Sequence, residues 1–178
     1  MATIIRPAEI TDREAAGNVC SRVLAEDPPY QYELNIGVPE CLNLVAEEEG
    51  SVVAYATTVL KRWNPQGRFL WERVAPYLAF VGVLPEKQRR GIGGLLLRST
   101  ISEIALRCPD EPLLFLEHHR QNPVAKRLFE SVGFRNMSDD EVFSMAGLYP
   151  KSAVMCFELA GARSNAGIAP VDCGKLKK

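Results

Sequence analysis

Hydrophobic and polar residues recur along the chain with two different periods, and each change of period marks a boundary between elements. Apolar residues at three- and four-residue spacing predict amphipathic helices, whereas short apolar or alternating runs predict strands. The predicted helices cover residues 12–26, a stretch from the glycines near residue 92 to residue 107, and the segment between Asn122 and Gly133. The predicted strands cover residues 3–6, 42–47, 52–60, 77–84, 113–117, 134–137 and 153–159.

Turn and capping residues sharpen several of these boundaries. Thr11 and Glu14 have the spacing of a capping box at the start of the first helix. The turn 48–50 is expected to close a hairpin between the second and third strands. Asn122 is a good N-cap for the last helix, with Pro123 at its first position. Residues 30–39 show no clean period, so they form either a loop or a short second helix.

This order of elements predicts an α/β (α+β) fold, a mixed sheet with helices on both faces. A length of 178 residues suits one domain with its own core. We expect that domain to occupy residues 1–160, because no linker interrupts them. Residues 161–178 lack periodicity and are expected to be a loosely held tail.

The most informative stretch, residues 77–97, joins a strand to a helix through a glycine-rich turn. Its strand is apolar throughout, which is typical of burial on both faces, and Pro85 ends it. A basic turn with Arg89 and Arg90 follows, and then glycines at 91, 93 and 94. Bare amides at a helix N-terminus, approached through glycines, favour an anion and most often a phosphate. The chain has neither a Walker loop nor a dinucleotide fingerprint, because Leu96 stands where the latter needs glycine.

Charge and cysteine content mainly exclude other classes of function. With 21 basic and 22 acidic residues, no net field favours nucleic acid or an anionic membrane. Residues 1–14 carry charges where a signal peptide needs an apolar centre, and no run approaches the ~20 apolar residues of a membrane span. The five cysteines are scattered without a CxxC pair, which predicts reduced thiols in a cytoplasmic protein. His118 and His119 have no further ligand at a useful spacing, so we expect ordinary polar residues and no metal.

Two motifs carry a resemblance to a known family. Gln88 to Gly93, after the strand end Val83-Leu84-Pro85, resembles the Q/R-x-x-G-x-G/A acetyl-CoA loop of the GCN5-related N-acetyltransferase (GNAT) family. Residues 116–134 resemble the second half of that family's acetyl-CoA core through Leu116, Glu117, Asn122, Ala125, Leu128, Gly133 and Phe134. This half is most similar to the ribosomal-protein N-terminal acetyltransferases, which share the pair Tyr149-Pro150.

The resemblance implies a mostly antiparallel sheet of six to seven strands whose central strands are splayed. It also implies that acetyl-CoA is the co-substrate, with its pyrophosphate on the turn amides and its pantetheine arm along the strand edge. Gly82 then suggests a bulge or a close backbone approach, and Asn122 either binds the pantetheine or serves only as a cap. The expected cofactor-binding residues are Val81, Gly82, Val83, Gln88, Arg89, Arg90, Gly91, Ile92, Gly93, Gly94, Asn122 and Phe129.

The implied reaction is acetyl transfer to a primary amine in a ternary complex, without an acyl-enzyme. Glu117 is the candidate general base, although a purely structural carboxylate is the alternative reading. The sequence departs from the family at Phe129, where a tyrosine is common and could protonate the thiolate. Tyr149 is the first candidate for that acid, followed by Tyr30 or Tyr32, unless the thiolate leaves unassisted.

The acceptor is the least determined part of the prediction. A small-molecule amine and a peptide or protein amine both fit, and segments 27–39, 61–73 and 135–152 are expected to build its site. A homodimer is left open. The alternative function is a catalytically weak, CoA-binding regulatory domain, which Phe129 favours and Glu117 opposes.

Overall fold

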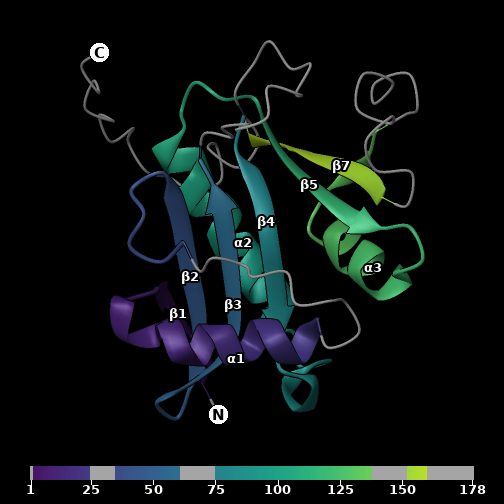
Figure 1. Cartoon of the computed structure of the whole chain (residues 1–178). Coiled ribbons are helices and arrows are strands. Elements are labelled where there is room, and N and C mark those ends of the chain that lie inside the picture. The colour runs from purple at the N-terminus through teal and green to yellow at the C-terminus, as the bar shows by residue number, and fades with distance from the viewer. Residues whose placement is uncertain (1, 25–34, 61–74, 138–151, 160–178) are drawn as a thin grey trace.

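In the part of the chain that the structure describes, seven strands form one open sheet in the order β1-β2-β3-β4-β5-β7-β6 (Figure 1). The computed structural model describes residues 2–24, 35–60, 75–137 and 152–159. Among the described strands, β4 and β5 are parallel neighbours and the other neighbouring pairs are antiparallel. The predicted mixed, mostly antiparallel sheet is therefore confirmed. The strands are β1 (Ile4–Pro7), β2 (Cys41–Glu48), β3 (Ser51–Val59), β4 (Tyr77–Val83), β5 (Leu113–His119), β6 (Arg135–Asn136) and β7 (Ser152–Glu158).

Helices cover both faces of this sheet. Helix α1 (Arg13–Val23) crosses one face over β3 and β4, and α2 (Ile92–Arg107) packs behind β1 to β4 (Figure 1). Helix α3 (Pro123–Ser131) follows β5 and contacts α2. A 3₁₀ turn, η1 (Ile10–Asp12), precedes α1, and another, η2 (Pro85–Lys87), follows β4. No described helix has the length and apolar character needed to cross a bilayer.

The hydrophobic core lies on both sides of β2 and β3. Residues 53–58 of β3 are all buried, because α1 covers one face and α2 the other. Val19 of α1 and Leu96 of α2 are fully buried at these two interfaces. The β2–β3 hairpin closes through Glu49 and Gly50, both with positive φ (51° and 77°), in the manner of a two-residue primed turn. The predicted hairpin is thus confirmed.

The start of α1 differs from the prediction. The capping box joins Glu9 and Asp12 rather than Thr11 and Glu14, with the Glu9 amide donating to Asp12 Oδ2 at 2.8 Å. Asp12 also accepts two hydrogen bonds from Arg6 of β1, at 2.6 and 2.9 Å. The contact between Arg6 of β1 and Asp12 favours the capping box at Glu9 and Asp12. Because the contact joins two different elements, a local sequence pattern cannot reveal it.

Strand β4 is buried on one face rather than on both. Leu78 and Phe80 are buried, whereas Ala79, Val81 and Val83 remain half-buried. Both rows are apolar, so the sequence predicted burial of both. The half-exposed apolar row is explained by the cleft that β4 borders.

The central strands are splayed, as predicted. Strand β4 pairs with β5 only at Tyr77↔Phe115 and Leu78↔Leu116, and beyond these residues the two strands diverge (Figure 1). Strand β5 meanwhile stays paired with β7 along its whole length. The β4 edge that faces β5 therefore has no neighbouring strand among the described residues from Ala79 onward.

Gly82 is explained by close approach and not by a bulge. The register shift lies at Ala79, since adjacent Thr57 and Thr58 pair with Phe80 and Leu78. A Cβ on Gly82 would lie 2.5 Å from Phe80 Cζ and 3.1 Å from Val23 Cγ2. The glycine lets the Phe80 ring and the end of α1 close over β4.

Several predictions fall outside the described residues. They include the end of the first helix at Glu26, residues 30–34 of segment 30–39, both tryptophans, Tyr149 and the tail from Gly161. The part of the chain that the structure describes contains no group of three or more potential metal ligands.

Candidate active site

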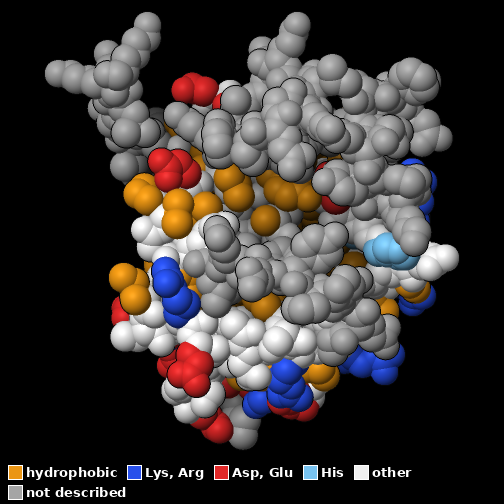
Figure 2. Space-filling view, viewed as in Figure 1, with side chains coloured by type: hydrophobic (Ala, Val, Ile, Leu, Met, Phe, Trp, Pro, Cys, Tyr) orange, Lys and Arg blue, Asp and Glu red, His pale blue; other side chains and the backbone are white. Residues whose placement is uncertain are grey.

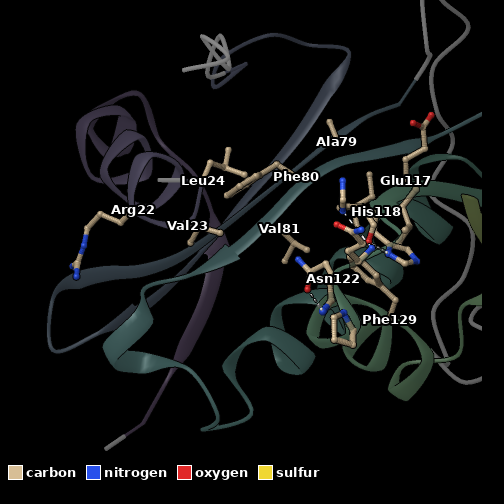
Figure 3. A pocket seen from close by; sticks show the side chains of 16 residues that line it. Arg22, Val23, Leu24, Ala79, Phe80, Val81, Glu117, His118, Asn122 and Phe129 are labelled. Carbon is tan, nitrogen blue, oxygen red and sulfur yellow. Dashed lines mark hydrogen bonds between the residues drawn. The ribbon is translucent and has the colours of Figure 1, made fainter. Parts of the chain in front are cut away.

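The divergence of β4 and β5 opens a cleft of about 790 Å³ (Figure 3). It is lined by the end of α1, by β4, by the end of β5 and by the start of α3. The predicted site residues Val81, Glu117, Asn122 and Phe129 all lie on its wall. Figure 2 shows hydrophobic side chains on this face of the sheet above α1, and Lys and Arg side chains at its lower right. A cleft of this size suits a cofactor-sized ligand.

The loop after β4 leads to the N-terminus of α2, where several backbone amides are free. Gly91 has φ 82°, and a Cβ there would meet nothing within 4 Å, so the left-handed backbone alone explains the glycine. The first hydrogen bond of α2 runs from the Leu95 amide to the Gly91 carbonyl at 3.0 Å. The amides of residues 91–94 donate to no acceptor among the described residues. Four such amides at the positive end of a helix dipole have the geometry that suits an anion.

Other loop residues hold the backbone in place. Gln88 Nε2 donates to the Val83 carbonyl at 3.0 Å, which folds the loop back onto β4. Arg89 adopts φ 61°, and its exposed guanidinium has no partner among the described residues. Ile92 is buried in the core, so only its backbone can face a ligand. At Gly93, a Cβ would lie 3.3 Å from Leu128 of α3, so this glycine permits the close packing of α2 on α3.

Glu48, at the end of β2, anchors this loop from inside the protein. Its carboxylate is 3% exposed and accepts from Lys87 Nζ at 3.0 Å, from Arg90 Nη1 at 3.1 Å and from the Thr3 hydroxyl at 2.9 Å. The Lys87 hydrogen bond, followed by that from Thr3 and the nearby charges of Arg90 and Lys87, lowers the pKa of Glu48. Arg90, predicted as a cofactor residue, is therefore held by Glu48. The sequence contained no signal for this anchor.

A second ion pair ties the loop to α1. Arg22 donates to both oxygens of Glu86, at 2.8 and 3.0 Å, across the surface. This contact holds the end of α1 beside the cleft, where Arg22, Val23 and Leu24 form part of the wall. Sequence reasoning did not assign these α1 residues to the site.

Asn122 caps α3 and keeps a donor free for the cleft. Its Oδ1 accepts from the Ala125 amide at 3.0 Å, which confirms the predicted cap. Its Nδ2 has no partner among the described residues, and Figure 3 shows the amide on the side of α3 that faces Val81. The geometry allows one side chain to serve both proposed roles.

Glu117 and His118 occupy adjacent positions on β5 and point in different directions. Glu117 is half-buried and pairs across the sheet with Val154 of β7. Figure 3 shows its carboxylate pointing away from the group formed by His118, Asn122 and Phe129. This is the alternation expected of successive strand residues.

His118, which the sequence analysis treated only as an ordinary polar residue, is buried. It is 8% exposed, it lines the cleft, and its ring centroid lies 6.2 Å from that of Phe129. His118 Nδ1 lies 2.9 Å from the carbonyl oxygen of His119. Nε2 is buried and has no hydrogen-bond partner among the described residues.

Comparison with known proteins identifies the family. The Acetyltransferase (GNAT) family matches residues 11–134. The chain belongs to this family. The GNAT resemblance inferred from the two motifs is confirmed, and with it the expectation of an acetyl-CoA-dependent acetyltransferase.

Solved structures of GNAT proteins share the fold. The ribosomal-protein-S18-alanine N-acetyltransferase from Escherichia coli has 23% identity over 89% of this chain and 94% of that chain, with a TM-score of 0.63. The PaiA N-acetyltransferase from Thermoplasma acidophilum, solved in complex with coenzyme A, has 17% identity over 89% and 99%, with a TM-score of 0.60. The protein yncA from Salmonella typhimurium, solved with its cofactor acetyl-CoA, has 22% identity over 97% and 100%, with a TM-score of 0.60.

The site of this GNAT protein fits acetyl-CoA on its own geometry. The bare amides of residues 91–94 suit a diphosphate. The unpaired β4 edge suits the amide-containing pantetheine arm, because an extended chain can add to an open edge as one more strand. The cleft near Leu116, where the strands part, then remains for the thioester and the acceptor.

Proposed function

We propose that the protein transfers the acetyl group of acetyl-CoA directly to a primary amine in a ternary complex. The observation that carries this proposal is the parting of β4 from β5 after Leu78 and Leu116. Strand β4 forms one side of the resulting cleft and leads to the free amides at the N-terminus of α2. Strand β5 forms the other side and carries Glu117. An acyl donor and an amine can therefore meet between the two strands without passing through a covalent enzyme intermediate.

The binding roles follow from the free groups. The amides of residues 91–94, with Arg89 at the rim, hold the diphosphate. The edge of β4 at Val81 and Val83 pairs with the pantetheine arm, and Gln88 keeps that edge and the loop in register. Asn122 Nδ2 donates to the arm from the opposite wall. When bound, acetyl-CoA supplies the activated acyl group as a thioester.

Glu117 prepares the acceptor in this proposal. A lysine-like ammonium has a pKa of ~10.4, so it must lose a proton before its nitrogen can attack. Glu117, half-buried on the cleft wall, takes that proton directly or through water and passes it to solvent. Tyr149, the sequence's candidate for the acid that protonates the thiolate, lies outside the described residues and stays a prediction.

The acceptor is a small-molecule amine or a peptide or protein amine. The fold similarity to an enzyme named for acetylating the alanine of ribosomal protein S18 supports including peptide N-termini among the candidates. The scattered cysteines of the sequence support a reducing, cytoplasmic setting.

A CoA-release assay tests the reaction. Purified protein is incubated with acetyl-CoA and a panel of polyamines, amino acids and peptides with free N-termini, and thiol release is measured alongside acetyl-CoA binding by calorimetry. We expect binding together with turnover of at least one amine. Binding without turnover of any amine would instead favour the alternative function, a CoA-binding regulatory domain. Phe129, which has no hydroxyl to act as an acid, is the residue that favours this alternative.

The substitution Gly91→Glu tests the proposed diphosphate site at the N-terminus of α2. A carboxylate at this position would occupy the anion site, so acetyl-CoA binding should be lost. Gly50→Glu is the matched control, because Gly50 also has positive φ and open space at its Cβ but lies in the β2–β3 turn. Unchanged acetyl-CoA affinity in Gly91→Glu would remove the loop assignment.

A further inference from the structure

We propose that the acceptor is an α-amine whose own carbon carries an apolar side chain, in an amino acid or at the N-terminus of a peptide. This inference rests on the proposed function and names the substrate class of its acceptor side. It arises from the two faces of the sheet, because the parting of β4 from β5 opens the cleft to both. The residues that line the cleft differ in chemistry between these faces.

One face of the cleft belongs to α2 and α3 and holds the groups proposed to bind acetyl-CoA. Val83 of β4 points to this face, since a Cβ on Gly93 of α2 would lie 3.5 Å from Val83 Cγ2. Asn122 and Phe129, at the start and within α3, line the cleft together on this side (Figure 3). With acetyl-CoA bound here, the opposite face, where α1 lies, remains for the acceptor.

The α1 face of the cleft is an apolar wall. Phe80 and Gly82 point to this face, because strand residues alternate and a Cβ on Gly82 would lie 3.1 Å from Val23 Cγ2 of α1. The same Cβ would lie 2.5 Å from Phe80 Cζ, so the glycine makes room for the ring beside the end of α1. There Val23 and Leu24 are half-buried and line the cleft. These three side chains offer a ligand no hydrogen bond.

Among the described residues with charged side chains, Arg22 and Glu117 line the cleft. Arg22 donates to both carboxylate oxygens of Glu86, at 2.8 and 3.0 Å, and Figure 3 shows its guanidinium at the far end from Glu117. The ring of His118 packs against Phe129 of α3, so alternation along β5 places Glu117 on the opposite face, with the apolar wall. A carboxylate beside an apolar wall suits an ammonium group that has an apolar neighbour.

The carboxylate also favours an α-amine over a lysine side chain. An α-ammonium group has a pKa of ~8, compared with ~10.4 for lysine. Because a carboxylate is a weak base, it generates more of the neutral nucleophile from the more acidic ammonium. The side chain on the same carbon would then lie against Val23, Leu24 and Phe80. A charged or polar side chain in that place would lose its water without gaining a hydrogen bond from this wall.

A series of peptides that differ only in their first residue tests the substrate class on the native protein. We expect kcat/KM to be about 10- to 100-fold higher for a first residue of leucine than for serine or aspartate, the usual range for discrimination by an apolar pocket. Leucine amide is assayed beside the peptide to tell a free amino acid from a peptide N-terminus, and preferred turnover of either supports the proposal. Equal rates across the series, or a preference for a polyamine or for a lysine peptide with a blocked α-amine, would overturn it.

The variant Leu24→Gln tests the wall itself. It should lower kcat/KM for the leucine peptide about tenfold and narrow the ratio of leucine to serine peptides, while the Kd for acetyl-CoA stays nearly unchanged. Ile5→Gln is the matched control, because Ile5 is also half-buried against the core but lies on β1, at the edge of the sheet away from the cleft. A leucine-to-serine ratio that is unchanged in Leu24→Gln, or equally narrowed in Ile5→Gln, would contradict the role of the wall.

The outcomes separate this inference from the function on which it rests. If acetyl-CoA does not bind, or if no amine is acetylated, the proposed function fails. If amines are acetylated without preference for an α-amine beside an apolar side chain, the proposed function stands and the substrate class is wrong.

Discussion

Single residues around the cleft combine a structural task with a proposed functional one. Asn122 caps α3 through Oδ1 and presents Nδ2. Gln88 closes the loop onto Val83 through its Nε2 hydrogen bond. Where one end of a side chain is held by the fold, its other end is oriented before any ligand arrives, which reduces the entropy lost on binding.

Asn122 allows the two tasks to be separated. Asn122→Asp keeps an oxygen that caps α3 but removes the donor, so the free energy of unfolding should change little while acetyl-CoA affinity falls. Asn122→Ala removes both and should also cost about 1 kcal/mol of stability through the lost cap. Chemical denaturation and calorimetry on the same samples measure the two effects. Full affinity in both variants would leave Asn122 as a cap alone.

At the scale of elements, the site depends on how the β4–α2 loop is braced. Glu48 at the end of β2 binds Lys87 and Arg90 from within, and Arg22 of α1 binds Glu86 from the surface. The surface pair is exposed and stabilises the protein little. The buried carboxylate matters more, because removing it leaves two cationic side chains without their shared partner.

Glu48→Gln should therefore weaken cofactor binding without touching the cofactor. We expect the KM for acetyl-CoA to rise about tenfold, the order of effect expected when hydrogen bonds of a charged group are lost, with kcat nearly unchanged. Glu47→Gln is the matched control: it precedes Glu48 on β2, but its carboxylate binds Arg6 at 2.8 Å, away from the loop. An equal rise in both variants would argue against a specific anchor.

On the scale of the whole molecule, ion pairs also join the N-terminal strand and helix to the sheet. Arg6 of β1 binds Asp12 before α1 and Glu47 of β2. The hydrogen bond from Arg6 is the main cause that lowers the pKa of Asp12 below its usual value. This network therefore fixes the start of α1, the end away from the cleft, against the sheet.

The lowered pKa of Asp12 predicts how stability depends on pH. A carboxyl group whose pKa is depressed by folding stabilises the protein above its unfolded pKa and loses that contribution as pH falls through the folded value. Urea unfolding should thus show Asp12→Asn to be less stable than the native protein at pH 7, by roughly 1–2 kcal/mol. The difference should shrink at acid pH, below about 4. A gap that is constant with pH would exclude the Asp12 charge as its cause.

The elements and the candidate loop could be predicted because their signals are local. Period, turn residues and caps determine backbone conformation over a few residues, which is why the Glu49-Gly50 hairpin and the Asn122 cap were found. The glycine-rich turn and its following helix were likewise readable from spacing. The motif at 116–134 placed Asn122 and Glu117 on one cleft, although it could not say which way either side chain points.

The sequence by itself thus determined the order of the elements, the family and the loop that ends in free amides. Only the tertiary structure decided the rest. The one-sided burial of β4, the burial of His118 and the anchoring of Arg90 by Glu48 all depend on segments far apart in the chain. Such contacts arise from how strands and helices pack, and an apolar or charged residue looks the same in sequence whichever neighbour it meets.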